Sequence, residues 1–296
     1  MVKFNKDELL GALMVVGAGM CWGTTGTTQA LTPPGASSLT IGAARLVAAG
    51  ILLALINLIR CRGAAFSRKG LNRGVFIAAA AIVLYQFSFF SGVRLTGVAI
   101  GTMIAIGSSP AMAGIMGALV FGERLSKRWF CATFLAVAGC SLLALTGNAD
   151  ASVKVSVLGV FLSLGAGLAY ALEGLGLRLA GSGGQSDTIT LVSVIGALLA
   201  LPVLIFGDCS WIAVPRGALA VLTLAVISTI VPFFLFTAGL HRVTMGKAYT
   251  LSLSEPMTAW LLSTVILGER ISFTGMVGIT VLFAGIVLLA CESKKD

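Results

Sequence analysis

The sequence has few charged residues for its length. Charged side chains make up 10% of the 296 residues, whereas 57% of the residues are apolar. A soluble domain carries about 25% charge. No soluble fold could bury this much apolar sequence, so the solvent around most of the chain is lipid. The composition therefore excludes a soluble domain and predicts an all-α integral membrane protein.

Residue types that bind metals or carry nucleophilic catalysis are also scarce. The only histidine is His241, and the six cysteines form no C-x-x-C pair. Neither a metal site, a cofactor nor a disulfide framework is therefore expected. No G-x-x-x-x-G-K-[ST] loop is present, so ATP is not expected to be the direct energy source. A membrane enzyme and a non-transporting receptor are the alternatives that the residues support least.

Long apolar runs are what the sequence has instead. A spanning helix needs about 20 mostly apolar residues. Charged or Pro/Gly-rich breaks divide the chain into ten such runs, and we predict that each is a transmembrane helix. The predicted spans are 10–30, 37–59, 74–93, 98–121, 129–145, 155–177, 188–206, 218–240, 248–267 and 275–291.

The net charge of +9 follows this topology and does not indicate a nucleic-acid partner. If the N-terminus is cytoplasmic, fifteen of the 20 Lys and Arg residues fall in inside segments, and Arg45 is intramembrane. The remaining four lie outside: Arg94, Lys154, Arg216 and Arg270. Basic residues are enriched in cytoplasmic loops of membrane proteins. The distribution therefore predicts that both the N-terminus and the C-terminus are inside.

One segment of the chain is repeated. Residues 110–143 and 256–289 share a Pro…Gly-Glu-Arg…Ala-Gly pattern at a constant offset of 146, which superposes Glu123 on Glu269. The period is about half of the chain, far beyond the periods of solenoids and propellers. Two equivalent halves therefore make up the protein.

Each half contains five of the predicted spans. We expect the first repeat to cover residues 1–147 and the second to cover 148–296, with the seam near 147–155. Because five is odd, the second repeat enters the membrane from the opposite side. Inverted repeats of this kind are typical of secondary transporters, whose site lies where the halves meet.

Short motifs in these spans resemble the EamA-type members of the drug/metabolite transporter superfamily. They are Cys-Trp-Gly-Thr-Thr-Gly at 21–26, Ala-Arg-Leu at 44–46, Ser-Glu-Pro at 254–256, and the repeated Pro…Gly-Glu-Arg…Ala-Gly segment. The resemblance covers essentially the whole chain. It implies a multi-pass transporter of the inner or plasma membrane that moves amino acids, metabolites or drugs, often outward. It does not fix the substrate.

Three ionisable residues are predicted at membrane depth, where lipid penalises charge. Glu173 is a candidate for binding a cationic substrate or a proton; the alternative is a helix-end residue that extends to the cytoplasmic surface or pairs with Arg178. Glu255, next to Pro256, is the second candidate for proton coupling, or else an acceptor for a neighbouring helix. Arg45 is predicted to be structural, holding carbonyls where helices cross, with a substrate carboxylate as the alternative partner.

The predicted substrate-binding residues are mainly aromatic and come from spans one, three, six and nine: Trp22, Tyr85, Gln86, Tyr170, Glu173, Tyr249, Ser252 and Trp260. One helical face of span nine would carry four residues at i, i+3, i+7 and i+11: Tyr249, Ser252, Pro256 and Trp260. Aromatic faces beside a carboxylate attract an ammonium group. The alternative is that these rings belong to the aromatic belts at the two membrane surfaces.

Charged residues at the ends of spans are interpreted as structural. Glu123 and Glu269 are each predicted to pair locally with the arginine that follows. Lys247 is interpreted as a topology charge at the cytoplasmic surface, and His241 as part of a solvated turn.

These features predict a secondary transporter that works by alternating access and is driven by a proton or substrate gradient. Its expected partners are the lipid bilayer, a small-molecule substrate and, as a candidate, a proton; no nucleic acid is expected. The acidic and aromatic residues favour a small organic amine such as choline as the substrate. Export of amino acids or drugs is the alternative. Transport direction and oligomeric state are not predicted.

The amine hypothesis predicts that the protein takes up choline in proteoliposomes. It also predicts that Glu173→Gln abolishes this uptake, because the carboxylate supplies the charge that attracts the ammonium group. A wild-type protein that ignores every cation tested and moves neutral amino acids would contradict the hypothesis.

Overall fold

The structure is a computed structural model that describes residues 6–66, 71–144, 156–181, 184–268 and 272–291. The described secondary structure is helical throughout. Glu269, Arg270 and the predicted seam at 147–155 lie outside the described residues, so the predicted Glu269–Arg270 pair is not placed.

The first repeat contributes five long helices, each with the length and hydropathy of a membrane span. Their bounds are α1 Lys6–Ala30, α2 Ser38–Cys61, α3 Arg73–Thr96, α4 Val98–Phe121 and α5 Lys127–Ala144, with a short 3-10 turn η1 at Ala64–Phe66. Polar side chains fix two of the starting points. Ser37 accepts from the N–H of Thr40 at 3.1 Å, and Asn72 accepts from the N–H of Val75 at 3.1 Å. Both are N-caps, which satisfy donors that a helix start leaves without a partner.

The second repeat is less regular. Its elements are α6 Val157–Leu179, α7 Gln185–Phe206, η2 Ser210–Ala213, α8 Pro215–Ala225, the π-helical segment η3 Val226–Ile230, α9 Val231–Leu240, α10 Met245–Leu251, α11 Ser254–Ile266 and α12 Phe273–Ala290. The elements α8, η3 and α9 follow one another directly and form one span, Pro215–Leu240. Counted over the described residues, nine segments meet the length and hydropathy of a span.

The remaining predicted span, residues 248–267, is divided into two helices. α10 ends at Leu251 and α11 begins at Ser254. The prediction of one continuous helical face is therefore wrong for this span, because Tyr249 lies on α10 and Trp260 lies on α11.

The two repeats pack with equivalent partners. α1 packs against α9 and α11, and its counterpart α6 packs against α3 and α4. α2 packs against α7 and α5 against α12, so these counterparts meet each other directly. α3 and α6 run antiparallel, because Gly74 approaches Ala180 near one end and Gly92 approaches Ser163 near the other. This packing is what two repeats related by a pseudo-two-fold axis produce.

The contact between α5 and α12 depends on small residues. A side chain at Gly139 would overlap the backbone of Gly278 and Leu282, and one at Gly285 would overlap the backbone of Ala132. Without a hydrophobic driving force between helices in lipid, such close backbone approach is what holds spans together. The glycines of the repeated segment are therefore scaffold.

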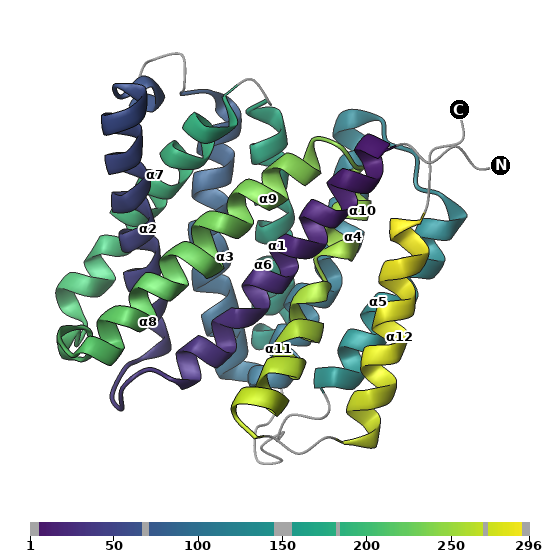
Figure 1. The fold of residues 1–296 in the computed structure, drawn as a ribbon. Helices are drawn as coiled ribbons and strands as arrows, with labels where there is room; N and C mark the ends of the chain where they lie inside the picture. The colour runs from purple at the N-terminus through teal and green to yellow at the C-terminus, as the bar shows by residue number, and fades with distance from the viewer. Residues whose placement is uncertain (1–5, 67–70, 145–155, 182–183, 269–271, 292–296) are drawn as a thin grey trace.

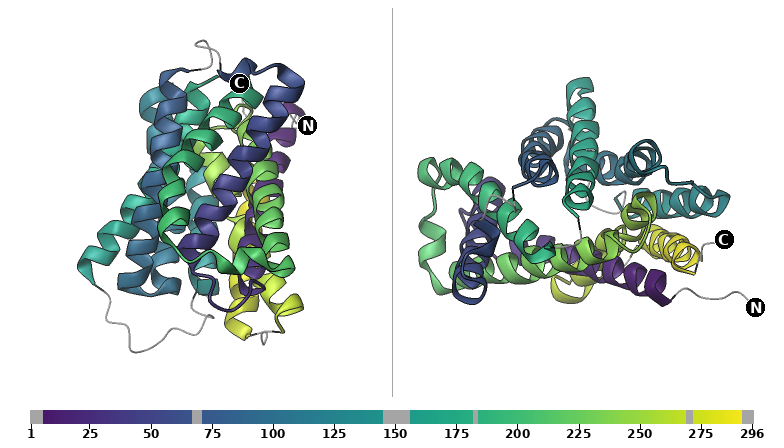
Figure 2. Two further views of the ribbon diagram at one scale, coloured as in Figure 1. Left: turned by 90° about the vertical axis from the view of Figure 1, so that its left-hand side faces the viewer. Right: turned by 90° about the horizontal axis from the view of Figure 1, so that it is seen from above.

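The outer surface of the bundle is apolar, as a lipid solvent requires. Ile59, Leu119, Phe134, Phe206 and Phe273 are each at least 74% exposed. Figures 1 and 2 show the tilted helices, with the start of α1 and the end of α12 at the same end of the bundle. We call this end the termini face. The protein is a multi-pass membrane protein.

The shared end and the distribution of basic residues predict that the termini face is cytoplasmic. A green fluorescent protein fused to the C-terminus should fluoresce in a bacterial host, and alkaline phosphatase fused there should be inactive. A fusion after Gly207, which follows α7 at the opposite end, should show the reverse behaviour. Active phosphatase at the C-terminus would contradict this orientation.

Candidate functional site

The interruption between α10 and α11 has a local cause. Pro256 has no N–H, and its ring excludes a helical bond to the carbonyl of Ser252, four residues earlier. That carbonyl accepts instead from the N–H of Glu255, at 3.0 Å, in a tighter turn. Ser252 and Leu253 are both buried. The break therefore lies inside the bundle, where non-helical backbone is tolerated at membrane depth.

The equivalent proline of the first repeat, Pro110, lies within the continuous helix α4. Before it stands Ser109, whose hydroxyl donates to the carbonyl of Ile106 at 2.8 Å. Ile106 is the residue four positions before the proline, so the serine supplies the donor that Pro110 lacks. Glu255 occupies the position of Ser109 in the second repeat, and its side chain forms no hydrogen bond with the described part of the chain.

Four of the five predicted aromatic residues meet in one network beside the break. The ring centroid of Tyr170 lies 4.7 Å from that of Tyr249 and 5.8 Å from that of Tyr85. The distance from Tyr170 to Trp22 is 6.0 Å. Phe236 of α9 completes the network, 5.2 Å from Trp22 and 5.4 Å from Tyr249. The sequence does not indicate Phe236, because one phenylalanine among the apolar residues of a span is not distinctive.

Tyr249 also bonds the backbone of α6. Its hydroxyl donates to the carbonyl of Tyr170 at 2.6 Å and accepts from the N–H of Gly174 at 3.1 Å. Any side chain at position 174 would collide with the tyrosine ring and hydroxyl. The glycine is therefore required for this contact, which joins the interrupted span to α6 next to Glu173.

Arg45, Glu173 and Glu255 are ionisable residues near the aromatic network. Glu173 is 6% exposed. Arg45 interacts electrostatically with Tyr85, Glu255 and Glu173. None of the three forms an ion pair with another described residue. The Nε of Arg45 is buried without a hydrogen-bond partner, so the predicted contact of Arg45 with backbone carbonyls is not present among the described residues.

The two polar candidates lie in different places. Ser252 is in the break, and its hydroxyl donates to the carbonyl of Tyr249 at 2.9 Å. Gln86 instead lines a small apolar groove of about 50 Å³ between α2, α3 and α7. Adjacent helical residues point in different directions. The structure thus brings Tyr85 to the aromatic network while Gln86 faces the groove.

Trp260 lies apart from the network and packs against Gly275 of α12. The first repeat contains the same contact with the two residues exchanged, because Trp129 of α5 packs against Gly114 of α4. The offset of 146 superposes Gly114 on Trp260 and Trp129 on Gly275. An indole against a glycine therefore joins the last two spans of each repeat, and the position of Trp260 favours a packing role.

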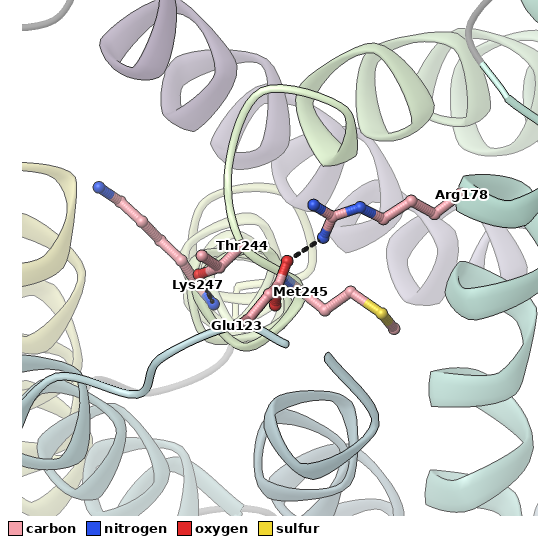
Figure 3. A network of polar contacts seen from close by, with 5 residues as sticks. All are labelled: Glu123, Arg178, Thr244, Met245 and Lys247. Carbon is pink, nitrogen blue, oxygen red and sulfur yellow. Dashed lines mark hydrogen bonds and ion pairs between the residues drawn. The ribbon is translucent and has the colours of Figure 1, made fainter. Parts of the chain in front are cut away.

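Ion pairs tie the helices together at the termini face, and Figure 3 shows the one between Glu123 and Arg178. Glu123, just after α4, pairs with Arg178 near the end of α6 and accepts from the N–H of Met245 at 2.8 Å. Lys247 pairs with Glu8 of α1 at 2.9 Å. A carboxylate at the start of α10 also interacts favourably with the helix dipole. α1, α4, α6 and α10 are thereby connected at this end.

Three interpretations of charged residues are wrong. Glu123 pairs with Arg178 and not with the following Arg124. Because Arg178 pairs with Glu123, the alternative prediction that it pairs with Glu173 is also wrong. Lys247 is 3% exposed and ion-paired, so it is no surface charge. Sequence spacing could not indicate these pairs, because their members lie far apart in the chain.

His241 caps the end of α9, and it is half-buried rather than solvated. Its Nε2 atom is buried without a hydrogen-bond partner. Burial, and next the positive charges of Arg178 and Arg242, lower the pKa of His241. The imidazole therefore stays neutral near pH 7.

The fold and the interior site define a class of protein. Two inverted repeats, an interrupted helix where they meet and unpaired charges at membrane depth are features of secondary transporters. The chain belongs to the EamA-like transporter family, which it matches over residues 9–145 and 157–291. It is a membrane transporter and not an enzyme.

Several known proteins are similar to this chain. An uncharacterized transporter of Bacillus subtilis, YwfM, is 38% identical over 96% of this chain and 95% of its own length. The threonine/homoserine exporter RhtA of Escherichia coli K12 is 31% identical over 62% of this chain and 63% of its own. The uncharacterized inner membrane transporter YicL of Salmonella typhimurium is 23% identical over 96% of both chains. A crystal structure with 19% identity has the same fold, with a TM-score of 0.79 over 94% of this chain and 95% of the other.

We expect Glu123→Ala to destabilise the protein by about 1–3 kcal/mol, because the half-buried guanidinium of Arg178 and the N–H of Met245 both lose their acceptor. Asp7→Ala is the matched control: it removes the more exposed pair with Arg242, worth about 0–1 kcal/mol. Thermal unfolding in detergent measures both variants. Equal, small shifts of the two midpoints would contradict a structural role for Glu123.

Proposed function

We propose that this chain is a secondary transporter that carries a small zwitterionic amino acid across the membrane by alternating access. The observation that carries the proposal is the group formed by Arg45, Glu173 and Glu255. The three lie around one aromatic network, and none of them forms an ion pair with another described residue. An amino acid presents one carboxylate and one ammonium group. Arg45 suits the carboxylate, because a guanidinium binds carboxylates through paired hydrogen bonds.

The ammonium group has two kinds of partner in this site. Glu173 and Glu255 supply negative charge, and the faces of Trp22, Tyr170 and Tyr249 supply the aromatic attraction for a cation. Each of these groups is buried or half-buried, so a substrate bound here would be largely out of water. In such surroundings electrostatic contacts are stronger than in water.

An amine without a carboxylate, such as choline, is the second candidate, because the aromatic network and the acidic residues suit it equally well. It would leave Arg45 without a partner, and an unpaired buried charge is costly. The similarity to a protein named as a threonine/homoserine exporter also favours an amino acid. We therefore place the amino acid first.

Alternating access follows from the inverted architecture. In transporters of this kind one repeat rocks against the other around a fixed central site. The units that we propose to move are the repeats 1–147 and 148–296. Carboxyl groups at membrane depth are usual sites of proton coupling, and Glu173 and Glu255 are the candidates here. We place the protein in the inner or plasma membrane, as the name of the relative YicL supports.

A ligand-stabilisation assay on the purified protein tests the substrate. We expect threonine or another small amino acid to raise the unfolding temperature, because a ligand of the native state stabilises it. The methyl ester of that amino acid, which has no carboxylate charge, should not. Arg45→Gln should weaken binding of the amino acid about tenfold or more, as expected for a lost charged hydrogen bond.

Two further variants, measured beside the wild type, make this test specific. Glu173→Gln should weaken binding of amino acids and amines alike. Thr280→Val should bind like the wild type, because Thr280 is in the exposed part of α12 and its hydroxyl bonds only its own helix. A wild-type protein that choline stabilises and no amino acid does would overturn the amino-acid proposal in favour of the amine.

A further inference from the structure

The hydroxyl of Tyr249 lies between two backbone groups that an α-helix normally joins to each other. Within an α-helix the carbonyl of residue i accepts from the N–H of residue i+4. Tyr170 and Gly174 stand in this relation on α6, and the hydroxyl contacts both, at 2.6 Å and 3.1 Å. The tyrosine donates to the first and accepts from the second, so it bridges one step of the helical ladder. Side chains or waters that insert into this ladder change the local course of a helix.

Glu173 belongs to the turn that the hydroxyl bridges. It immediately precedes Gly174, and it is the buried carboxylate of this helix. The hydroxyl of Tyr249 bonds the backbone on both sides of Glu173, and these bonds fix this turn of α6 against α10. The placement of the Glu173 carboxyl group therefore depends on a side chain from α10.

We propose that Tyr249 is a positioning residue: its hydroxyl, bonded to the backbone on both sides of Glu173, sets the placement of the Glu173 carboxyl group and makes that placement depend on α10. This contact is independent of the substrate, whereas its consequence for ligand affinity rests on the proposed function. Gly174 is part of the same contact, because a side chain at this position would collide with the hydroxyl of Tyr249.

The short helix α10 is suited to this role. Glu123 holds its first turn at the termini face, through the N–H of Met245, and its other end is the break at Ser252. A displacement of α10 would withdraw the hydroxyl and leave the carbonyl of Tyr170 and the N–H of Gly174 to bond each other alone, as in a regular α-helix. No backbone group of α6 would be orphaned in either arrangement, which lipid would otherwise penalise heavily. The turn thus has two satisfied states.

The sequence allows the turn to be observed alone. Glu173–Gly174 is the one Glu-Gly pair in the chain. Protein labelled with ¹³C-carbonyl glutamate and ¹⁵N-glycine therefore gives a single carbonyl-to-amide NMR cross-peak, from this peptide bond. In full-length protein in nanodiscs, we expect Tyr249→Phe to move the cross-peak and to shift the pH at which it titrates, because the carboxyl group changes its distance from Arg45.

Thr250→Val is the matched control. Thr250 is the next residue on α10, and its buried hydroxyl bonds Thr133 of α5 at 2.8 Å, away from α6. This variant should leave the cross-peak and its titration as in the wild type. If Tyr249→Phe does not fold, 3-fluorotyrosine in the wild-type sequence replaces it: the more acidic hydroxyl must move the Gly174 amide resonance.

An unchanged cross-peak in Tyr249→Phe, or with fluorotyrosine, would overturn the contact of the Tyr249 hydroxyl with this turn. A cross-peak that moves while its titration stays fixed would overturn the positioning of Glu173. Ligand affinity is a separate readout, expected to fall about tenfold in Tyr249→Phe and not in Thr250→Val. If no ligand binds the wild type, the proposed substrate is wrong, and the NMR measurements still decide the role of Tyr249.

Discussion

Lipid offers no hydrogen bonds to the backbone, and this constraint shapes the whole bundle. Every carbonyl and N–H at membrane depth must find a partner within the protein. Where a proline removes a donor in α4, the hydroxyl of Ser109 replaces it. Where a proline interrupts the ninth span, the carbonyl of Ser252 is satisfied in a tight turn, within the buried centre. The irregular backbone of the site therefore exists only because the surrounding helices exclude lipid from it.

The two repeats share a scaffold and differ at the site. The indole-on-glycine contact occurs in both, with the tryptophan and the glycine exchanged between the two last spans. Ser109 and Glu255 occupy equivalent positions, yet the first supports a continuous helix and the second lies beside a break. A symmetric scaffold suits motion between two equivalent arrangements. The asymmetric residues supply the charge that a particular substrate can recognise.

Burial removes water both from the charged residues of the termini face and from those around the aromatic network, but only the first group gains ion-pair partners among the described residues. Glu123, Arg178, Lys247 and Glu8 lose water on burial and regain partners in each other. Arg45, Glu173 and Glu255 lose water without such pairing among the described residues. Buried charges without partners are costly, so the protein retains them where a substrate or a proton can supply what is missing. One group of charged residues thus stabilises the fold, and the other group is available to a substrate or a proton.

The membrane class, the two repeats and nine of the ten spans could be predicted from the sequence, because apolar length, charge and internal repetition are local properties of the chain. The sequence also indicated four residues of the aromatic network, which stand out among aliphatic residues: Trp22, Tyr85, Tyr170 and Tyr249. Helix packing alone places Phe236 beside them, pairs Glu123 with Arg178 and brings Tyr249 to the backbone of α6. These contacts join residues that are dozens of positions apart. Spacing along a chain does not encode them, because they depend on how whole helices tilt and pack.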